Sequence, residues 1–165
     1  MQHVQPRSTT SALVLTAVLI ALATLFTMYT KIPVPGIRGY FNVGDVVIMT
    51  SALLLGRKYG AYIGAIGPAL ADLFLGYAVF VPITFVVKGI EGYLVGTVYN
   101  NKTTTSALVA TIVGGIVIVA GYFIAEYFVF DPGVAIASIL TNTIQAVMSV
   151  IISIILYAIL RKRLG

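Results

Sequence analysis

Long apolar stretches interrupted by very few charges constrain this chain more than any other feature. The 165 residues are 59% hydrophobic and 9% charged, a composition outside the usual range of soluble globular domains. A membrane-spanning helix needs about 20 predominantly apolar residues, so there is room for about six spans and short loops. Because hydrocarbon offers no partner to unpaired backbone groups, we expect every span to be helical. The sequence predicts an all-α membrane protein, a six-transmembrane-helix bundle.

Proline, glycine and polar turns separate the apolar stretches and give the expected boundaries. The whole chain, 1–165, is predicted to be a single transmembrane domain, with no room for a soluble one. The predicted spans cover about 11–29, 45–56, 59–77, 82–99, 106–130 and 134–160. The second of these is short for a full crossing.

The distribution of basic residues predicts the orientation in the membrane. Most of the ten Lys and Arg residues lie in segments that would share one face: Arg7, Arg57, Lys58, Lys102, Arg161, Lys162 and Arg163. Cytoplasmic loops carry an excess of Lys and Arg, so we expect both termini to be cytoplasmic and the loop 31–44 to be external. The positive net charge then reflects membrane orientation, and no nucleic-acid partner is expected.

A few ionisable side chains lie inside the predicted spans. Asp72, Lys88 and Glu91 are within or at the edge of apolar stretches, and Asp45 opens another. A charge at membrane depth costs about 3 kcal/mol on insertion scales, so it needs a partner or a function. These residues predict a polar ligand site facing the outside. The alternatives are a structural ion pair that joins helices and, for Asp45, a helix N-cap.

Other polar side chains fall at similar depths. Thr84, Lys88 and Glu91 follow helical spacing and share one face. Asn142 and Gln145 form a second pair on one face of the last span, and amides both donate and accept hydrogen bonds. Both sets are candidates for ligand contacts, and hydrogen bonding between helices is the alternative.

The predicted external loop ends in Tyr40, Phe41 and Asn42. The two rings suit a lid over a planar ligand, with Asn42 as a polar contact beside them. The alternative for the rings is the aromatic belt at the membrane interface, and for Asn42 a turn.

Small residues recur at four-residue spacing in several spans. Ala17 and Ala21 form such a step in the first span, which contains no charged residue. Small faces let helices approach closely. We expect most of these faces to serve internal packing, and the first to be available to another subunit.

Enzyme motifs are absent from the sequence. The chain has no Cys, a single His, no phosphate-binding loop, no His-Glu-x-x-His and no Gly-x-Ser-x-Gly. We therefore expect no enzyme activity, no catalytic residue, no metal site and no cofactor.

Three segments resemble a known family. They are Tyr40-Phe41-Asn42-Val43-Gly44-Asp45, Gly67-Pro68-Ala69-Leu70-Ala71-Asp72 and Lys88-Gly89-Ile90-Glu91-Gly92. They are similar to segments of the substrate-binding S components of energy-coupling factor (ECF) vitamin transporters, in the branch named for riboflavin uptake. Similar sequences are assigned to pyridoxine or hydroxymethylpyrimidine.

The resemblance implies a six-helix bundle in a prokaryotic plasma membrane that binds one vitamin from outside. It implies a membrane T subunit and two cytoplasmic ATPases as partners, with the T subunit contacting Ala17 and Ala21. It also implies that the loop after the first helix closes over the ligand, and that the S component topples to deliver it. Well-known riboflavin binders of a more distant branch carry Asp-Phe-Ser-Asp where this chain has Asn42-Val43-Gly44-Asp45.

Our interpretation is a riboflavin-type S component. Tyr40 and Phe41 would cover the ring of the vitamin. The polar atoms of the vitamin would contact the following residues: Asn42, Asp45, Asp72, Thr84, Lys88, Glu91, Asn142 and Gln145. The alternatives are a pyridoxine or hydroxymethylpyrimidine S component, a proton-coupled secondary transporter, and a structural membrane subunit.

Overall fold

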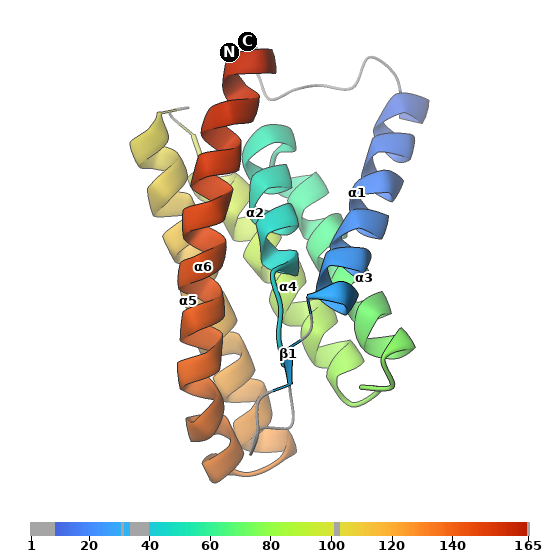
Figure 1. Cartoon of the computed structure of the whole chain (residues 1–165), viewed down its shortest axis with the longest axis vertical. Helices are drawn as coiled ribbons and strands as arrows, with labels where there is room; N and C mark the ends of the chain where they lie inside the picture. Colours follow the sequence, from blue (N-terminus) through green and yellow to red (C-terminus); the bar gives the residue numbers. More distant parts are fainter. Residues whose placement is uncertain (1–8, 31, 34–39, 101–102, 165) are drawn as a thin grey trace.

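Six helices form a bundle in the computed structural model, which describes residues 9–30, 32–33, 40–100 and 103–164 (Figure 1). The prediction of an all-α bundle of six helices is confirmed, with one pair of two-residue antiparallel strands beside it. In chain order the elements are α1 (Thr9–Tyr29), β1 (Ile32–Pro33), β2 (Tyr40–Phe41), α2 (Gly44–Leu55), α3 (Arg57–Phe74), α4 (Phe80–Val98), α5 (Thr104–Val129) and α6 (Pro132–Leu164).

Four of the helices, α1, α4, α5 and α6, are long and apolar enough to cross a membrane. Helix α2 has 12 residues and is about 18 Å long at 1.5 Å per residue, well short of the roughly 30 Å of hydrocarbon. Helix α3 carries Arg57, Lys58 and Asp72 within its 18 residues. The bundle therefore combines four long spans with two helices of shorter or more polar character.

Two helices end at residues other than those expected. Helix α3 stops at Phe74 instead of about 77, because Gly76 has a positive φ of 80° that closes the turn toward α4. Helix α6 continues past 160 to Leu164, with Arg161, Lys162 and Arg163 in its last turn. Basic residues form helix readily and stabilise the negative end of the helix dipole, so the helix continues through them.

The apolar core lies toward the end of the bundle that carries these basic residues, called here the basic end. The end of α6 and the turn between α2 and α3 are both at this end (Figure 1). The core is formed by buried residues of α2, α4, α5 and α6: Met49, Ala52, Leu53, Val95, Tyr99, Ala107, Ala110, Ile118, Ala146 and Tyr157. The hydroxyls of Tyr99 and Tyr157 hydrogen-bond to each other within it. The buried charges lie closer to the opposite end.

Helices α3 and α4 are in backbone contact along a row of glycines. A Cβ atom added at Gly60 would lie 2.5 Å from the carbonyl oxygen of Gly92, and one at Gly92 would collide with the backbone of Gly60. A Cβ at Gly64 would likewise collide with the carbonyl of Lys88. This close approach brings Lys88 and Glu91 of α4 deep into the bundle.

The glycine contact predicts a packing defect in Gly92→Ala. The added methyl meets the rigid backbone of α3, so the helices must separate, at a cost of about 1–3 kcal/mol. We expect a lower melting temperature in detergent, measured by the loss of monodisperse protein on heating. Gly89→Ala is the matched control, because its Cβ meets the side chain of Ala65 at 3.2 Å and no backbone atom closer than 3.7 Å. Equal stability of the two variants would contradict this account of the helix contact.

Candidate functional site

A small polar cavity lies in the half of the bundle away from the basic end. Its volume is about 40 Å³, and a single water needs about 10–15 Å³ on the same measure, so the cavity has room for a few waters. Every helix except α2 contributes to its wall, and Asn42 contributes from the segment that enters α2. The lining residues are Thr27, Asn42, Pro68, Asp72, Phe80, Thr84, Lys88, Tyr122, Glu126, Ser138, Thr141, Asn142 and Gln145.

The short helix α2 is the reason that the cavity exists at this depth. Helix α2 begins only at Gly44, and the β1–β2 pair lies beyond its N-terminus, next to α6 (Figure 1). Gly44 has no room for a side chain, because an added Cβ would collide with the hydroxyl of Thr27. Because the chain passes close to α1 at Gly44, the neighbouring residues Asn42 and Asp45 lie against α1, α4 and α6.

Lys88 is the centre of the charged network at the base of the cavity. Its ammonium group forms an ion pair with Asp45, and its Nζ lies 3.6 Å from Glu91 Oε2. All three side chains are at most 1% exposed. The second oxygen of Asp45, Oδ2, accepts a hydrogen bond of 2.7 Å from Gln145 Nε2. Asp45 therefore joins α2 to both α4 and α6.

Asp45 does not cap α2, which was the alternative from the sequence. The N-cap residue is Val43, and no side-chain cap hydrogen bond is formed. The carboxylate of Asp45 instead points to the interior, where Lys88 and Gln145 bind it. Asp45 is the closer carboxylate partner of Lys88, and Glu91 lies farther away.

Gln145 connects this network to the segment that precedes α2. Its Oε1 accepts a hydrogen bond of 3.0 Å from the backbone N–H of Asn42. The side chain of Asn42 in turn accepts from the backbone N–H of Gly44 at 2.8 Å. One amide of α6 thus links the buried ion pair to the segment that follows β2.

Tyr122 and Thr84 form one wall of the cavity. Their hydroxyls lie 3.0 Å apart and share a hydrogen bond between α5 and α4. The Nζ of Lys88 lies 5.5 Å from the centre of the Tyr122 ring, within range of a cation–π interaction. The tyrosine ring therefore shields the ammonium group from the apolar side.

Another part of the wall carries a carboxylate and an unpartnered hydroxyl. Glu126 of α5 is buried and accepts a hydrogen bond from the hydroxyl of Ser138 on α6. The hydroxyl of Thr27 on α1 is also buried and has no hydrogen-bond partner within the described residues. Both groups line the cavity.

The structure brings most of the predicted site residues together. Asn42, Asp72, Thr84, Lys88, Asn142 and Gln145 all line the cavity, whereas Asp45 and Glu91 lie behind the wall and hold Lys88. The backbone of Tyr40 and Phe41 forms β2, and their side chains lie outside the described part of the structure, as does most of the predicted lid.

Several lining residues were not predicted from the sequence: Thr27, Pro68, Phe80, Tyr122, Glu126 and Ser138. Glu126 carried a usable signal, because it is an ionisable residue inside the span predicted at 106–130 and falls under the same rule as Asp72. Hydroxyl and aromatic residues such as Thr27 and Phe80 carry no comparable signal, since both types are common on helices that only pack together.

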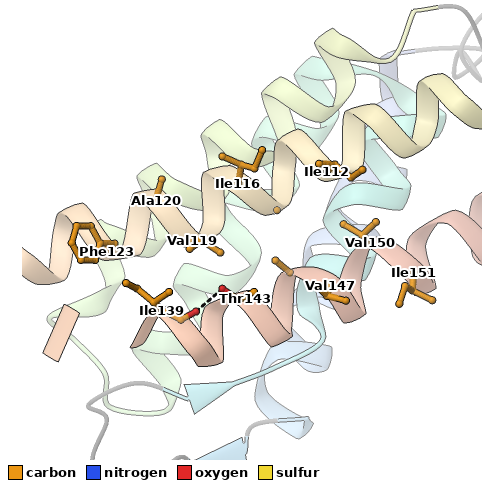
Figure 2. A pocket seen from close by; sticks show the side chains of 12 residues that line it. Ile112, Ile116, Val119, Ala120, Phe123, Ile139, Thr143, Val147, Val150 and Ile151 are labelled. Carbon is orange, nitrogen blue, oxygen red and sulfur yellow. Dashed lines mark hydrogen bonds between the residues drawn. The ribbon is translucent and has the colours of Figure 1, made fainter. Parts of the chain in front are cut away.

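A larger groove of about 570 Å³ lies between α5 and α6 (Figure 2). Its walls are apolar side chains, among them Ile116, Phe123 and Val147. The hydroxyl of Thr143 donates to the backbone carbonyl of Ile139 at 2.7 Å, so it is not free for a ligand (Figure 2). This surface suits hydrocarbon and offers nothing to the polar atoms of a vitamin, so the candidate site is the smaller polar cavity.

The charged network predicts a strong effect of Lys88→Met. The substitution removes the ammonium group and leaves Asp45 and Glu91 as buried carboxylates without a cation, which typically costs about 3–5 kcal/mol. We expect a large drop in melting temperature in detergent, partly restored in Lys88→Met/Asp45→Asn. If the Lys88→Met protein were as stable as the wild type, the ion pair would not be what holds the helices together.

The comparisons with known proteins agree with this architecture. Residues 7–162 match the model of a family described as ECF-type riboflavin transporter, S component. A solved structure described under "Structure and mechanism of the S component of a bacterial ECF transporter" has the same fold, with a TM-score of 0.74, 21% identity, and coverage of 96% of this chain and 99% of that one.

Two relatives match over most of their length. A Pyrococcus woesei protein described as uncharacterized is 42% identical over 86% of this chain and 96% of its own length. The thiamine precursor transporter HmpT of Lactococcus lactis subsp. cremoris (strain MG1363) is 30% identical over 89% of this chain and 83% of its own. This chain is accordingly a multi-pass protein of the prokaryotic plasma membrane, and it belongs to the family of ECF-type riboflavin transporter S components.

Proposed function

We propose that this protein captures riboflavin from outside the cell as the S component of an ECF importer. The main support for this proposal is a polar cavity, lined by buried charged and amide groups, in an otherwise apolar bundle. The description of the matching family names riboflavin, which supports this vitamin. The buried hydroxyl of Thr27, which has no hydrogen-bond partner within the described residues, also lines this cavity and is available to a ligand.

A smaller heterocycle is the second candidate. HmpT, at 30% identity, is named as a thiamine precursor transporter, and hydroxymethylpyrimidine is a ligand of that kind. A cavity of about 40 Å³ must widen for either ligand, and far less for one ring than for the three rings of a flavin. Pyridoxine is similar in size to hydroxymethylpyrimidine, so both are included in the binding test.

We also propose that α1 contacts the T subunit, which with two ATPases would drive delivery of the vitamin. Ala17 and Ala21 are both exposed on α1, on a face that the rest of the bundle leaves uncovered. Ala23 and Thr24 face inward instead, and the Thr24 hydroxyl donates to the carbonyl of Gly67 on α3 at 2.9 Å. Helix α1 is therefore anchored on one side and offers small residues on the other.

A proton-coupled carrier is the competing class. Asp72, Lys88 and Glu91 would form its relay, but Lys88 is already paired with Asp45 and lies within 3.6 Å of Glu91 in a buried cluster. Reconstitution of the chain alone separates the classes, because an S component without its partners moves no substrate across vesicles, whereas a self-sufficient carrier does.

Vitamin binding gives the direct test. We expect purified protein to bind riboflavin, seen as quenched flavin fluorescence, or one smaller vitamin in a thermal-shift panel of riboflavin, pyridoxine and hydroxymethylpyrimidine.

Asn142→Ala should weaken that binding at least about tenfold, or 1.4 kcal/mol, because its amide lines the cavity and makes no hydrogen bond within the described residues. Asn100→Ala removes an exposed amide at the basic end and serves as control. No binding across the panel would refute the proposed function.

If α1 contacts the T subunit, substitutions on its exposed face should abolish transport without changing vitamin binding. Ala17→Trp/Ala21→Trp fills the exposed face of α1 without touching the cavity, so vitamin binding should be unchanged while uptake by cells containing the T subunit and ATPases is lost. Leu108→Trp, which places an indole ring on an exposed face of α5, is the control. Persistent uptake in the α1 variant would show that this face is not the contact.

A further inference from the structure

Glu126 lines the cavity with a carboxylate that forms no ion pair within the described residues. It lies three residues before the end of α5 and is buried. Among the described residues its side chain accepts one hydrogen bond, from Ser138, and forms no ion pair. An ionised carboxylate has about four acceptor positions, so most of its capacity remains available to a ligand.

Lys88 does not compensate this carboxylate. Its ammonium group is engaged by Asp45 and lies within 3.6 Å of Glu91, so two carboxylates already share it. The other cations of the described residues are Arg57, Lys58, Arg161, Lys162 and Arg163, at the basic end. A buried carboxylate is stabilised by positive charge or by N–H and O–H donors, and the cavity is where these can arrive.

The hydroxyl of Thr27 supplies a second, independent indication of a ligand. It is 1% exposed, has no hydrogen-bond partner among the residues that the structure describes, and lines the same cavity from α1. Buried polar atoms nearly always have a partner, so an orphan beside a cavity marks a position for a bound group. Glu126 accepts, and the hydroxyl of Thr27 can donate or accept.

Ser138 gives the carboxylate a defined position. Its hydroxyl donates to Glu126 Oε2, and the backbone carbonyl of Ala135 lies 3.0 Å from the same hydroxyl as an alternative acceptor. The link joins α5 to α6 across the cavity wall. Ser138 is therefore a positioning residue, while Glu126 is the group that can contact a ligand.

We infer that Glu126 selects ligands by accepting a hydrogen bond from an N–H group on the edge of a nitrogen heterocycle. The inference rests on the proposed function and adds a residue that determines specificity. Riboflavin offers such a donor at N3, and hydroxymethylpyrimidine offers one at its amino group, so the chemistry is common to both candidates. A ligand N–H that reaches Glu126 would also stabilise its ionised form, and hydrogen bonds to an ionised acceptor are about twice as strong as neutral ones.

Two pairs of ligands, each differing by one donor, test the inference on the purified full-length protein. Riboflavin is compared with 3-methylriboflavin, and hydroxymethylpyrimidine with the same pyrimidine lacking its amino group. For the vitamin that binds, Glu126→Gln should lower the affinity for the ligand that carries the N–H donor at least about tenfold. The affinity for the matched ligand without that donor should fall less than about threefold, because this ligand makes no hydrogen bond to the carboxylate. The ligand pair that shows this difference in affinity loss identifies the vitamin whose N–H group Glu126 binds.

Controls separate a local effect from a general loss of structure. Asp131→Asn removes a nearby exposed carboxylate, keeps an acceptor for the N–H of Val134, and should leave both affinities unchanged. Glu126→Asp retains the charge but withdraws it from the cavity, and it replaces Glu126→Gln if that variant is not monodisperse. The aspartate variant should also penalise only the donor-bearing ligand.

The outcomes distinguish this inference from the proposed function. If wild-type protein binds a vitamin but both members of its pair lose affinity equally in the Glu126 variants, or neither does, Glu126 only joins α5 to α6 and the inference is wrong. If wild-type protein binds neither riboflavin nor hydroxymethylpyrimidine nor pyridoxine, the proposed function itself is wrong.

Discussion

The ion pair between Lys88 and Asp45 is the interaction on which the arrangement of the site depends. Neither charge is tolerable alone in an interior surrounded by hydrocarbon, so each requires the other at contact distance. Their pairing draws α2 against α4, and the hydrogen bond from Gln145 to Asp45 adds α6. Three helices distant in sequence are thus held together at one point. The cavity lies directly beside that point.

The glycine contacts and the short second helix make this pairing geometrically possible. The backbones of α3 and α4 touch at Gly60 and Gly92, which brings Lys88 to the centre of the bundle. Helix α2 begins late, at Gly44, so its first turn presents Asp45 at the same depth. The part of the bundle beyond α2 is left without a helix to fill it, and polar side chains enclose a small space there. The apolar core and the polar cavity accordingly occupy different levels of one bundle.

The hydrogen bond between Gln145 and Asn42 joins the cavity wall to the segment that follows β2. The same amide that holds Asp45 accepts a hydrogen bond from the backbone of Asn42, just after β2. A ligand that enters the cavity must come close to this amide and to Asn142 beside it on α6. A cavity of this volume must widen to admit a vitamin.

The sequence by itself determined the class of the protein and most of the polar residues around its site. Apolar stretches of spanning length leave helices as the only way to satisfy the backbone in a membrane, so six helices followed directly. The cost of buried charge likewise singled out Asp72, Lys88 and Glu91. Glu126 was within reach of the same rule, whereas Thr27 and Phe80 were not. Only the tertiary structure decided that Lys88 pairs most closely with Asp45, that Asp45 does not cap α2, and that Glu126 and Thr27 line the same cavity. Spacing within one helix defines which residues share a face, but the partner of a buried charge depends on how separate helices cross, and that is set by packing across the whole bundle.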